Sequence, residues 1–397
     1  MRILYTYIIK EHIFPFFMSL GIILFLFVLN IIMKMMSSFV GKGIDILIII
    51  EFFYLSLGWI LAMAIPMSVL VATLMAYGRL AQDNEYAVMQ SSGISIFKVL
   101  TPAFTIGIAL SFFMLSFNNH ILPEMNHKNK LLKHAIKRKK PMAVVEPGFF
   151  INDIPGVIFK AEEVDNINKT LTDVIMIQKS TIEKSRRTIT AKTGKVYFDE
   201  NSSNYNFEFY DGEFSNLDLK ESNNYIRSAF SKMILRVEDK NGSFKVDDND
   251  YYSDREKSTD SLMAKIQRLE ARKASKEIIN SVKVEYYKKF AISFACLIFA
   301  LTGAPLGLMS GKGGLGSSAV LSIILFTIYW IFLMSGEDLS DRGLLNPVFA
   351  MWNANIITGI LGVFMIWQAS KGAKISFGFI PTFFRYLKSI FSKGRNA

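Results

Sequence analysis

Long apolar runs fill the two ends of the chain, and one polar segment, residues 121–284, separates them. Each apolar run is close to the ~20 residues that an α-helix needs to cross the hydrocarbon core of a bilayer. The runs lie at residues 13–33, 46–77, 96–117, 290–309, 317–336 and 348–367. The pattern predicts an α-helical membrane protein with six transmembrane helices, three before the polar segment and three after it.

The polar segment has a different pattern, in which short β-branched and aromatic runs are separated by Asn, Asp, Gly and Pro. Between residues 205 and 209, for example, aromatic and polar residues alternate, which gives a strand one apolar and one wet face. Asp211-Gly212 is a turn signal after this run. We therefore expect consecutive antiparallel strands in an all-β sandwich or open barrel, and then a helix over residues 258–284 that leads back to the membrane.

These patterns divide the chain into parts with different roles. The parts are residues 1–120, with three helices and a short helix within 79–95; 121–284, the β insert with helical linkers; 285–370, with three more helices; and 371–397, a basic amphipathic tail. The first 15 residues lack the cleavage pattern of a signal peptide, so the first helix is expected to stay in the protein. The single cysteine, Cys296, excludes an intrachain disulfide, so the insert must fold on its own core.

The chain has a formal net charge of +11, although 51% of its residues are hydrophobic. A basic excess can face nucleic acid, or it can mark the cytoplasmic flanks of membrane helices. Here many Lys and Arg residues flank the apolar runs, whereas the loop over residues 337–342 is mostly acidic. We expect no nucleic-acid partner. We place the N- and C-termini in the cytoplasm and the large insert on the opposite side of the membrane.

The residues offer little support for hydrolytic chemistry, nucleotide binding or metal binding. The glycines around Gly311 lack the spacing, and the following Ser or Thr, of a phosphate-binding P-loop. His120, His127 and His134 recur every seven residues, but seven helical residues span ~10.5 Å, too far for two nitrogens to share one ion. We therefore expect no catalytic residue, metal site or bound cofactor, and the chain is predicted not to be an enzyme.

The loop between the second and third helices, residues 78–95, predicts a short amphipathic helix. Asp83 or Asn84 can cap its start, and Gly93 can end it. Glu85 in its first turn suits the helix dipole. Such a helix at the cytoplasmic face is either a knob for the groove of a soluble partner or a plain interfacial connector, and the residues alone leave both interpretations open.

Lys34 stands where the first apolar run meets the outer surface. A lysine there can extend its ammonium group to the lipid headgroups at little cost, or it can meet an anionic lipid phosphate that enters between helices. Lys42 and the basic run at 128–140 favour the second interpretation slightly. The tail residues 379–393 mix aromatic and basic side chains, which is typical of an amphipathic anchor in the membrane plane.

Several short matches along the whole chain resemble, in their order and spacing, the LptF/LptG permeases of the lipopolysaccharide exporter. The matches are the Tyr7–Glu11 lead-in, Gly78–Ser95 with Glu85 and Gly93, Glu146-Pro147-Gly148 at the start of the β insert, Glu285–Phe290, Pro305-Leu306-Gly307, and Asn346-Pro347 with Trp352 and Asn353. No single motif is decisive, but together they are specific. The residues do not say which of the two paralogues the chain is.

The resemblance implies a function. In this family two paralogous permeases, LptF and LptG, pair and sit on a dimer of a cytoplasmic ABC ATPase, which uses the ATP. The complex extracts lipopolysaccharide from the inner membrane. It then passes the lipid to LptC-like and LptA-like periplasmic jellyroll proteins towards the outer membrane. The insert, roughly residues 142–250, would be a jellyroll-like domain in the periplasm whose interior takes acyl chains.

The resemblance also implies two sets of site residues. Glu85 would be the acidic residue of a coupling helix that docks in the ATPase groove, and Arg79, Asp83 and Gly93 would belong to the same site. The first and fifth membrane helices would form a lateral gate and the cavity wall. The lipid-contacting residues would be Phe27, Asn30, Lys34, Lys42, Phe326 and Trp330.

Two other functions fit parts of the pattern. Lipoprotein-type ABC permeases usually have four membrane helices, with the large domain directly after the first, whereas here it follows the third. A membrane receptor or scaffold with a periplasmic β binding domain would need neither a contact between Glu85 and an ATPase nor a greasy interior in the insert. Charge reversal at Glu85 separates the scaffold from the exporter.

Overall fold

The computed structural model describes residues 2–39, 45–139, 147–154, 157–165, 170–180, 185–199, 204–218, 225–237, 252–310 and 314–371. The chain divides into two compact units. One unit consists of Met1–Phe27, Leu57–Met125 and Tyr252–Ala397, and the other of Val28–Ser56 and Asn126–Tyr251. The first unit holds most of the long helices, and the second holds the β insert.

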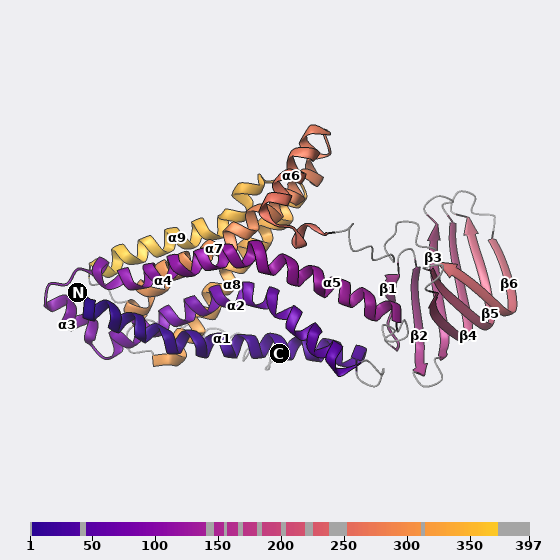
Figure 1. Cartoon of the computed structure of the whole chain (residues 1–397), viewed down its shortest axis with the longest axis horizontal. Helices are drawn as coiled ribbons and strands as arrows, with labels where there is room; N and C mark the ends of the chain where they lie inside the picture. Colours follow the sequence, from indigo (N-terminus) through magenta and orange to yellow (C-terminus); the bar gives the residue numbers. More distant parts are fainter. Residues whose placement is uncertain are drawn as a thin grey trace, which may run out of the picture. The chain divides into compact units, whose positions relative to one another are not determined.

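Figure 1 shows long helices and a separate group of strands. The helical elements are α1 (Arg2–Phe39), α2 (Ile46–Gln82), α3 (Glu85–Ser91), α4 (Ile96–Ser116), the π turn η1 (Phe117–Ile121), α5 (Leu122–Lys139), the 3-10 turn η3 (Asp254–Glu256), α6 (Thr259–Ala271), α7 (Lys276–Ser310), α8 (Gly314–Asp341) and α9 (Pro347–Ser370). The described residues contain six helices long and apolar enough to cross a membrane, three on each side of the insert. The predicted number and arrangement of membrane helices are therefore confirmed.

Two of these helices extend well beyond the apolar runs that predicted them. α4 continues through η1 into α5, so the predicted boundary at residue 121 falls inside one long helical segment. α7 begins at Lys276, well before the apolar run that starts at residue 290. Hydropathy marks where a helix enters hydrocarbon, whereas the Leu, Lys, Glu and Met residues in these extensions are good helix formers in water as well.

α7 is the central helix of its unit. In its most apolar window 72% of the residues are buried, compared with 6% for α1. It packs against α4, α8 and α9. Small residues allow close packing: a Cβ atom at Gly307 would lie only 2.8 Å from the carbonyl oxygen of Leu74 on α2. α1, by contrast, has most of its apolar surface uncovered by the part of the chain that the structure describes.

The insert folds as one antiparallel sheet. Its strands are β1 (Ile151–Ile154), β2 (Val157–Asp165), β3 (Thr170–Ser180), β4 (Ser185–Asp199), β5 (Asn204–Asp218) and β6 (Tyr225–Val237), and they pair in sequential order. Cross-strand neighbours such as Phe159, Met176 and Ile189 build a buried apolar face. The all-β insert is confirmed, but the described strands form a single meander rather than the two sheets of a sandwich.

The turn predicted at Asp211-Gly212 is wrong, because β5 runs through it. Asp211 has a φ of 49°, and Asp173 on β3 has the same value. The register omits Asp173 and Asp211, although it is unchanged on either side of each residue. Positive φ at an Asp residue therefore marks a local irregularity inside each of these strands rather than a hairpin.

Candidate functional site

α3 lies between α2 and α4, at the end of the bundle where α1 begins (Figure 1). Its C-terminus is closed by two backbone hydrogen bonds, from Gly93 N–H to Gln90 O (3.0 Å) and from Ile94 N–H to Met89 O (3.0 Å). Gly93 has a φ of 78°, the left-handed conformation that this type of helix end requires. Gly93 therefore ends the helix, as the sequence predicts.

The start of α3 differs from the prediction. Asn84 is the N-cap residue, but it has a φ of 59° and its side chain makes no capping hydrogen bond. Asp83 instead lies 3.6 Å from Arg79, on the last turn of α2. α2 ends at Gln82, so the chain must enter α3 within two residues, and Asn tolerates the left-handed conformation that this sharp turn needs.

Glu85 is held by a residue from the first helix. The Tyr7 hydroxyl lies 2.8 Å from Glu85 Oε1 and 2.9 Å from Oε2, so it donates its proton to this carboxylate. Arg79 forms an ion pair with Glu11, at 2.9 Å from Nη1 to Oε2. We name Tyr7, Glu11, Arg79, Asp83 and Glu85 the α3 cluster. It joins the Tyr7–Glu11 lead-in to the 78–95 loop, two segments that sequence reasoning treated separately.

α3 has an inner and an outer face. Tyr86 and Met89 pack against the hydrophobic core of the bundle, and burial raises the pKa of the Tyr86 hydroxyl. Val88 on the other face is 64% exposed. Tyr86 and Met89 therefore anchor the helix to the bundle, while its other face exposes Val88, and the half-buried carboxylate of Glu85 lies at its first turn.

The structure places Phe27, Asn30 and Lys34 on α1, and Phe326 and Trp330 on α8. Phe27 contacts the Trp59 ring edge-on at 5.9 Å between centroids, and Asn30 is exposed on α1. Phe326 and Trp330 stack on α8 with centroids 5.9 Å apart. The backbone of Lys34 is helical, but its side chain lies outside the described part of the chain, as does the whole of Lys42.

A second charged cluster joins α7, α8 and η3. Lys288 Nζ lies 2.6 Å from Glu337 Oε1 and 3.6 Å from Glu285 Oε1, and Arg255 Nε lies 3.0 Å from Glu285 Oε1. Glu337 is only 8% exposed. Its Oε2 has no hydrogen-bond partner among the described residues. We name Arg255, Glu285, Lys288 and Glu337 the η3 cluster, and the Glu285 carboxylate raises the pKa of Arg255.

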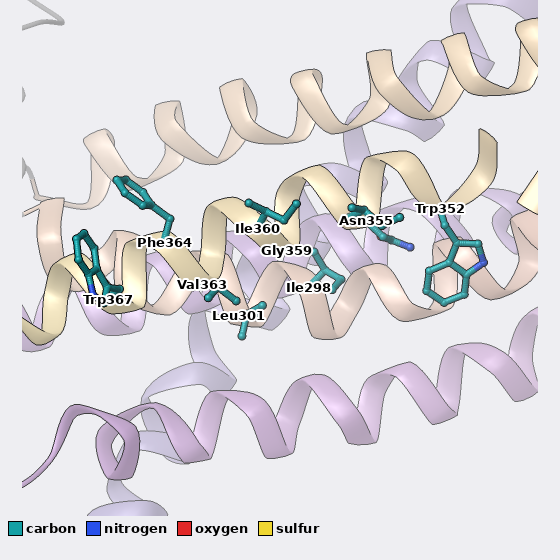
Figure 2. Close-up of a pocket in the computed structure, with 10 residues that line it drawn as sticks. Ile298, Leu301, Trp352, Asn355, Gly359, Ile360, Val363, Phe364 and Trp367 are labelled. Carbon is teal, nitrogen blue, oxygen red and sulfur yellow. The ribbon is translucent and has the colours of Figure 1, made fainter. Parts of the chain in front are cut away.

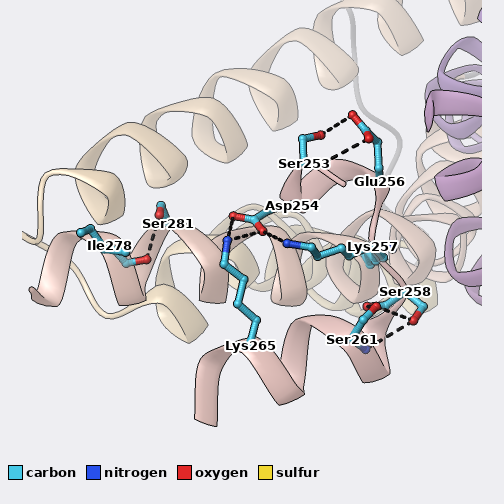
Figure 3. A network of polar contacts seen from close by, with 10 residues as sticks. Ser253, Asp254, Glu256, Lys257, Ser258, Ser261, Lys265, Ile278 and Ser281 are labelled. Carbon is cyan, nitrogen blue, oxygen red and sulfur yellow. Dashed lines mark hydrogen bonds and ion pairs between the residues drawn. The ribbon is translucent and has the colours of Figure 1, made fainter. Parts of the chain in front are cut away.

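The return segment, residues 252–271, has its own polar network next to this cluster (Figure 3). Lys265 Nζ lies 2.6 and 2.7 Å from the two oxygens of Asp254, and Lys257 Nζ lies 3.1 Å from Oδ1. Burial alone would raise the pKa of Asp254, but these two lysines outweigh it and lower that pKa. The network fixes the segment before it enters α7.

Sequence reasoning missed the η3 cluster, because its members are far apart along the chain. It also missed this network, although Lys265 is only 11 residues from Asp254. One local signal was present: Ser253 and Glu256 have the spacing of a capping box, and the structure forms it. Glu337 was expected in an acidic loop, whereas it lies inside α8.

An apolar groove of about 730 Å³ runs between α7 and α9 (Figure 2). Its lining includes Ile298 and Leu301 on α7, and Trp352 and Trp367 near the two ends of α9. Asn355 is the polar residue in the lining, and its amide donates to the carbonyl oxygen of Ala291 (2.9 Å). Nothing in this groove suggests catalysis, and the described residues contain no group of His, Cys, Asp and Glu that could hold a metal ion.

Comparison with known families gives one match across almost the whole chain. The family described as lipopolysaccharide export system permease LptF/LptG matches residues 6–368. No curated protein matches the chain. With the six apolar helices, this match identifies a multi-pass protein of the inner membrane and the membrane subunit of a transporter.

Proposed function

The chain belongs to the LptF/LptG family of lipopolysaccharide export permeases, and from that premise we propose that it is one of two paired subunits that extract lipopolysaccharide from the inner membrane. Its partners are the paralogous permease, LptF or LptG, and a dimer of a cytoplasmic ABC ATPase that hydrolyses the ATP. The permease itself binds no cofactor. The lipid leaves towards LptC-like and LptA-like jellyroll proteins in the periplasm.

In this proposal the termini and α3 face the cytoplasm and the β insert lies in the periplasm. The basic flanks of the apolar runs support the orientation through the positive-inside rule. The apolar face of the sheet supports a role in lipid transfer. An acyl chain in water loses roughly 0.8 kcal/mol for each exposed methylene, so it needs such a face along its route.

The proposed entry route for the lipid uses helices that this chain leaves uncovered. α1 has the least buried apolar window of the six, and only 28% of the window of α8 is buried. Uncovered apolar surface of this kind suits a gate that closes against a second permease or opens to a lipid. The proposed contacts are Phe27, Asn30, Lys34, Lys42, Phe326 and Trp330.

The exposed face of α3 is the observation that best supports a role in coupling to the ATPase. Its inner residues are anchored in the bundle, Val88 is exposed, and the carboxylate of Glu85 stands at its first turn. A short rigid helix with one apolar and one acidic contact suits a groove on a soluble ATPase, where a partner cation can pair with Glu85. Arg79, Asp83 and Gly93 shape the turns on either side of it.

Charge reversal at Glu85 tests this function. Glu85→Lys places a cation opposite the partner's cation, so the ATPase should no longer co-purify with the permease in detergent, and lipopolysaccharide export should stop. Export is measured as transfer of lipid from proteoliposomes that contain the whole permease–ATPase complex to a periplasmic acceptor protein.

The matched control is Asp338→Lys, the same charge reversal on the exposed surface of α8. This variant should retain both the ATPase and export. If Glu85→Lys still binds the ATPase and still exports lipid, the coupling assignment is wrong. A chain that recovers only a periplasmic partner, with no ATPase and no lipid, would instead be a receptor or scaffold.

A further inference from the structure

The Glu85 carboxylate is hydrogen-bonded to an uncharged group, the hydroxyl of Tyr7. Among the described residues, Tyr7 is the one that hydrogen-bonds to Glu85, and it reaches both carboxylate oxygens, at 2.8 and 2.9 Å. A carboxylate has about four lone-pair positions for hydrogen bonds, and one phenol proton cannot fill them. A neutral donor also leaves the negative charge of Glu85 in place.

Arg79, the cation of the same cluster, contacts the Tyr7 hydroxyl and pairs with carboxylates other than that of Glu85. Its guanidinium pairs with Glu11 at 2.9 Å, and its Nε lies 3.6 Å from Asp83. Glu11 is mostly buried, with a side chain 17% exposed, so it is a well-defined partner on α1. The cluster thus pairs Arg79 with two other carboxylates and leaves Glu85 with a hydroxyl.

We propose that Tyr7 is a positioning residue for the docking of the ATPase: its hydroxyl holds the Glu85 carboxylate in one orientation without neutralising it. The inference rests on the proposed function and adds to it the first helix as part of the coupling apparatus. The occupant of the free lone pairs is a guanidinium or ammonium group of the ATPase. Orientation before binding matters because immobilising a Glu side chain on binding has an entropic cost.

The test measures the affinity of the ATPase for the complete permease pair in lipid nanodiscs. Tyr7→Phe keeps the ring and removes only the hydroxyl, and it should weaken ATPase binding about tenfold, roughly 1.4 kcal/mol. Tyr5→Phe is the matched control, because Tyr5 is a partly exposed tyrosine on the same helix that has no bond to Glu85. It should bind the ATPase normally.

A double-mutant cycle distinguishes a positioning role of Tyr7 from a general folding defect. In a Glu85→Gln background, Tyr7→Phe should cause no further loss of affinity, since the carboxylate that it orients is gone. The melting temperature of the permease pair should be the same for Tyr7→Phe and Tyr5→Phe, so that a folding defect can be recognised.

The other outcomes are distinct. If Glu85→Gln weakens ATPase binding but Tyr7→Phe does not, the positioning role is overturned and the docking role stands. Additive losses in the double variant would show that Tyr7 acts independently of Glu85, and they also overturn the inference. If Glu85→Gln and Glu85→Lys both bind the ATPase with the original affinity, the docking role itself fails, and the role of Tyr7 fails with it.

Discussion

The two charged clusters of the helical unit use the same residue types for opposite purposes. The α3 cluster is more open: Arg79 and Asp83 are each 51% exposed, and among the described residues the Glu85 carboxylate accepts hydrogen bonds from a neutral donor, Tyr7. The η3 cluster is closed at its centre, where the side chains of Lys288 and Glu337 are 15% and 11% exposed and pair at 2.6 Å, although its Arg255 side chain is 70% exposed. Burial decides the difference. A buried charge must be compensated inside the protein, whereas an exposed one remains available to a partner.

The largest expected effect comes from breaking the closed cluster. Lys288→Met leaves the Glu337 carboxylate buried, and Arg255, at 3.7 Å, is then its remaining cationic partner among the described residues. The free energy of unfolding should fall by about 3 kcal/mol, as when one partner of a buried ion pair is removed. Unfolding by denaturant in mixed micelles measures this change.

Two further variants test whether the loss in Lys288→Met comes from the buried ion pair. Lys283→Met on the same helix breaks a more exposed pair with Glu270, so it should lower the unfolding free energy by less than about 1 kcal/mol. Lys288→Met combined with Glu337→Met removes both charges and should recover most of the loss. Equal losses for Lys288→Met and Lys283→Met would contradict the contrast between the clusters.

An intermediate effect is expected from acid at the return segment. The pKa of Asp254 is lowered in the folded state, so its contribution is present above the unfolded pKa of about 3.9 and is lost as the pH falls through the folded value. The segment 252–271 should then lose about 1–2 kcal/mol of local stability. Hydrogen exchange of its backbone amides, at neutral pH and at about pH 3, measures this loss.

Asp254→Asn should show the weakened protection already at neutral pH. Asp260→Asn is the control, since Asp260 is exposed on the first turn of α6. If the protection of the segment is independent of pH in the wild-type protein, Asp254 does not hold it in place.

The smallest effect on stability is expected at the open cluster. Asp83→Asn removes the ion pair between Asp83 and Arg79, whose side chains are both 51% exposed, so the unfolding free energy should change by no more than about 0.5 kcal/mol. The same denaturant unfolding experiment measures it. A loss as large as that of Lys288→Met would show that the α3 cluster is structural rather than reserved for a partner.

Much of the architecture was predictable because it depends on local composition. Apolar runs of membrane-spanning length predicted six helices, and alternating runs between turn residues predicted the β insert. Gly93 ended α3 as expected, since a helix end of this type needs a residue that accepts positive φ. The misses were the helix ends and the strand-internal Asp211-Gly212. Each depends on contacts rather than on local preference.

The candidate site was predictable only as separate parts. The sequence alone determined that Glu85 would stand in the first turn of a short helix between two membrane helices, because turn residues and hydropathy are local properties. The tertiary structure alone decided that Tyr7, 78 residues earlier, would meet that carboxylate, and that Arg255, Lys288 and Glu337 would come together. Such pairings depend on how helices pack, and side-chain packing is set by the whole core rather than by any one segment.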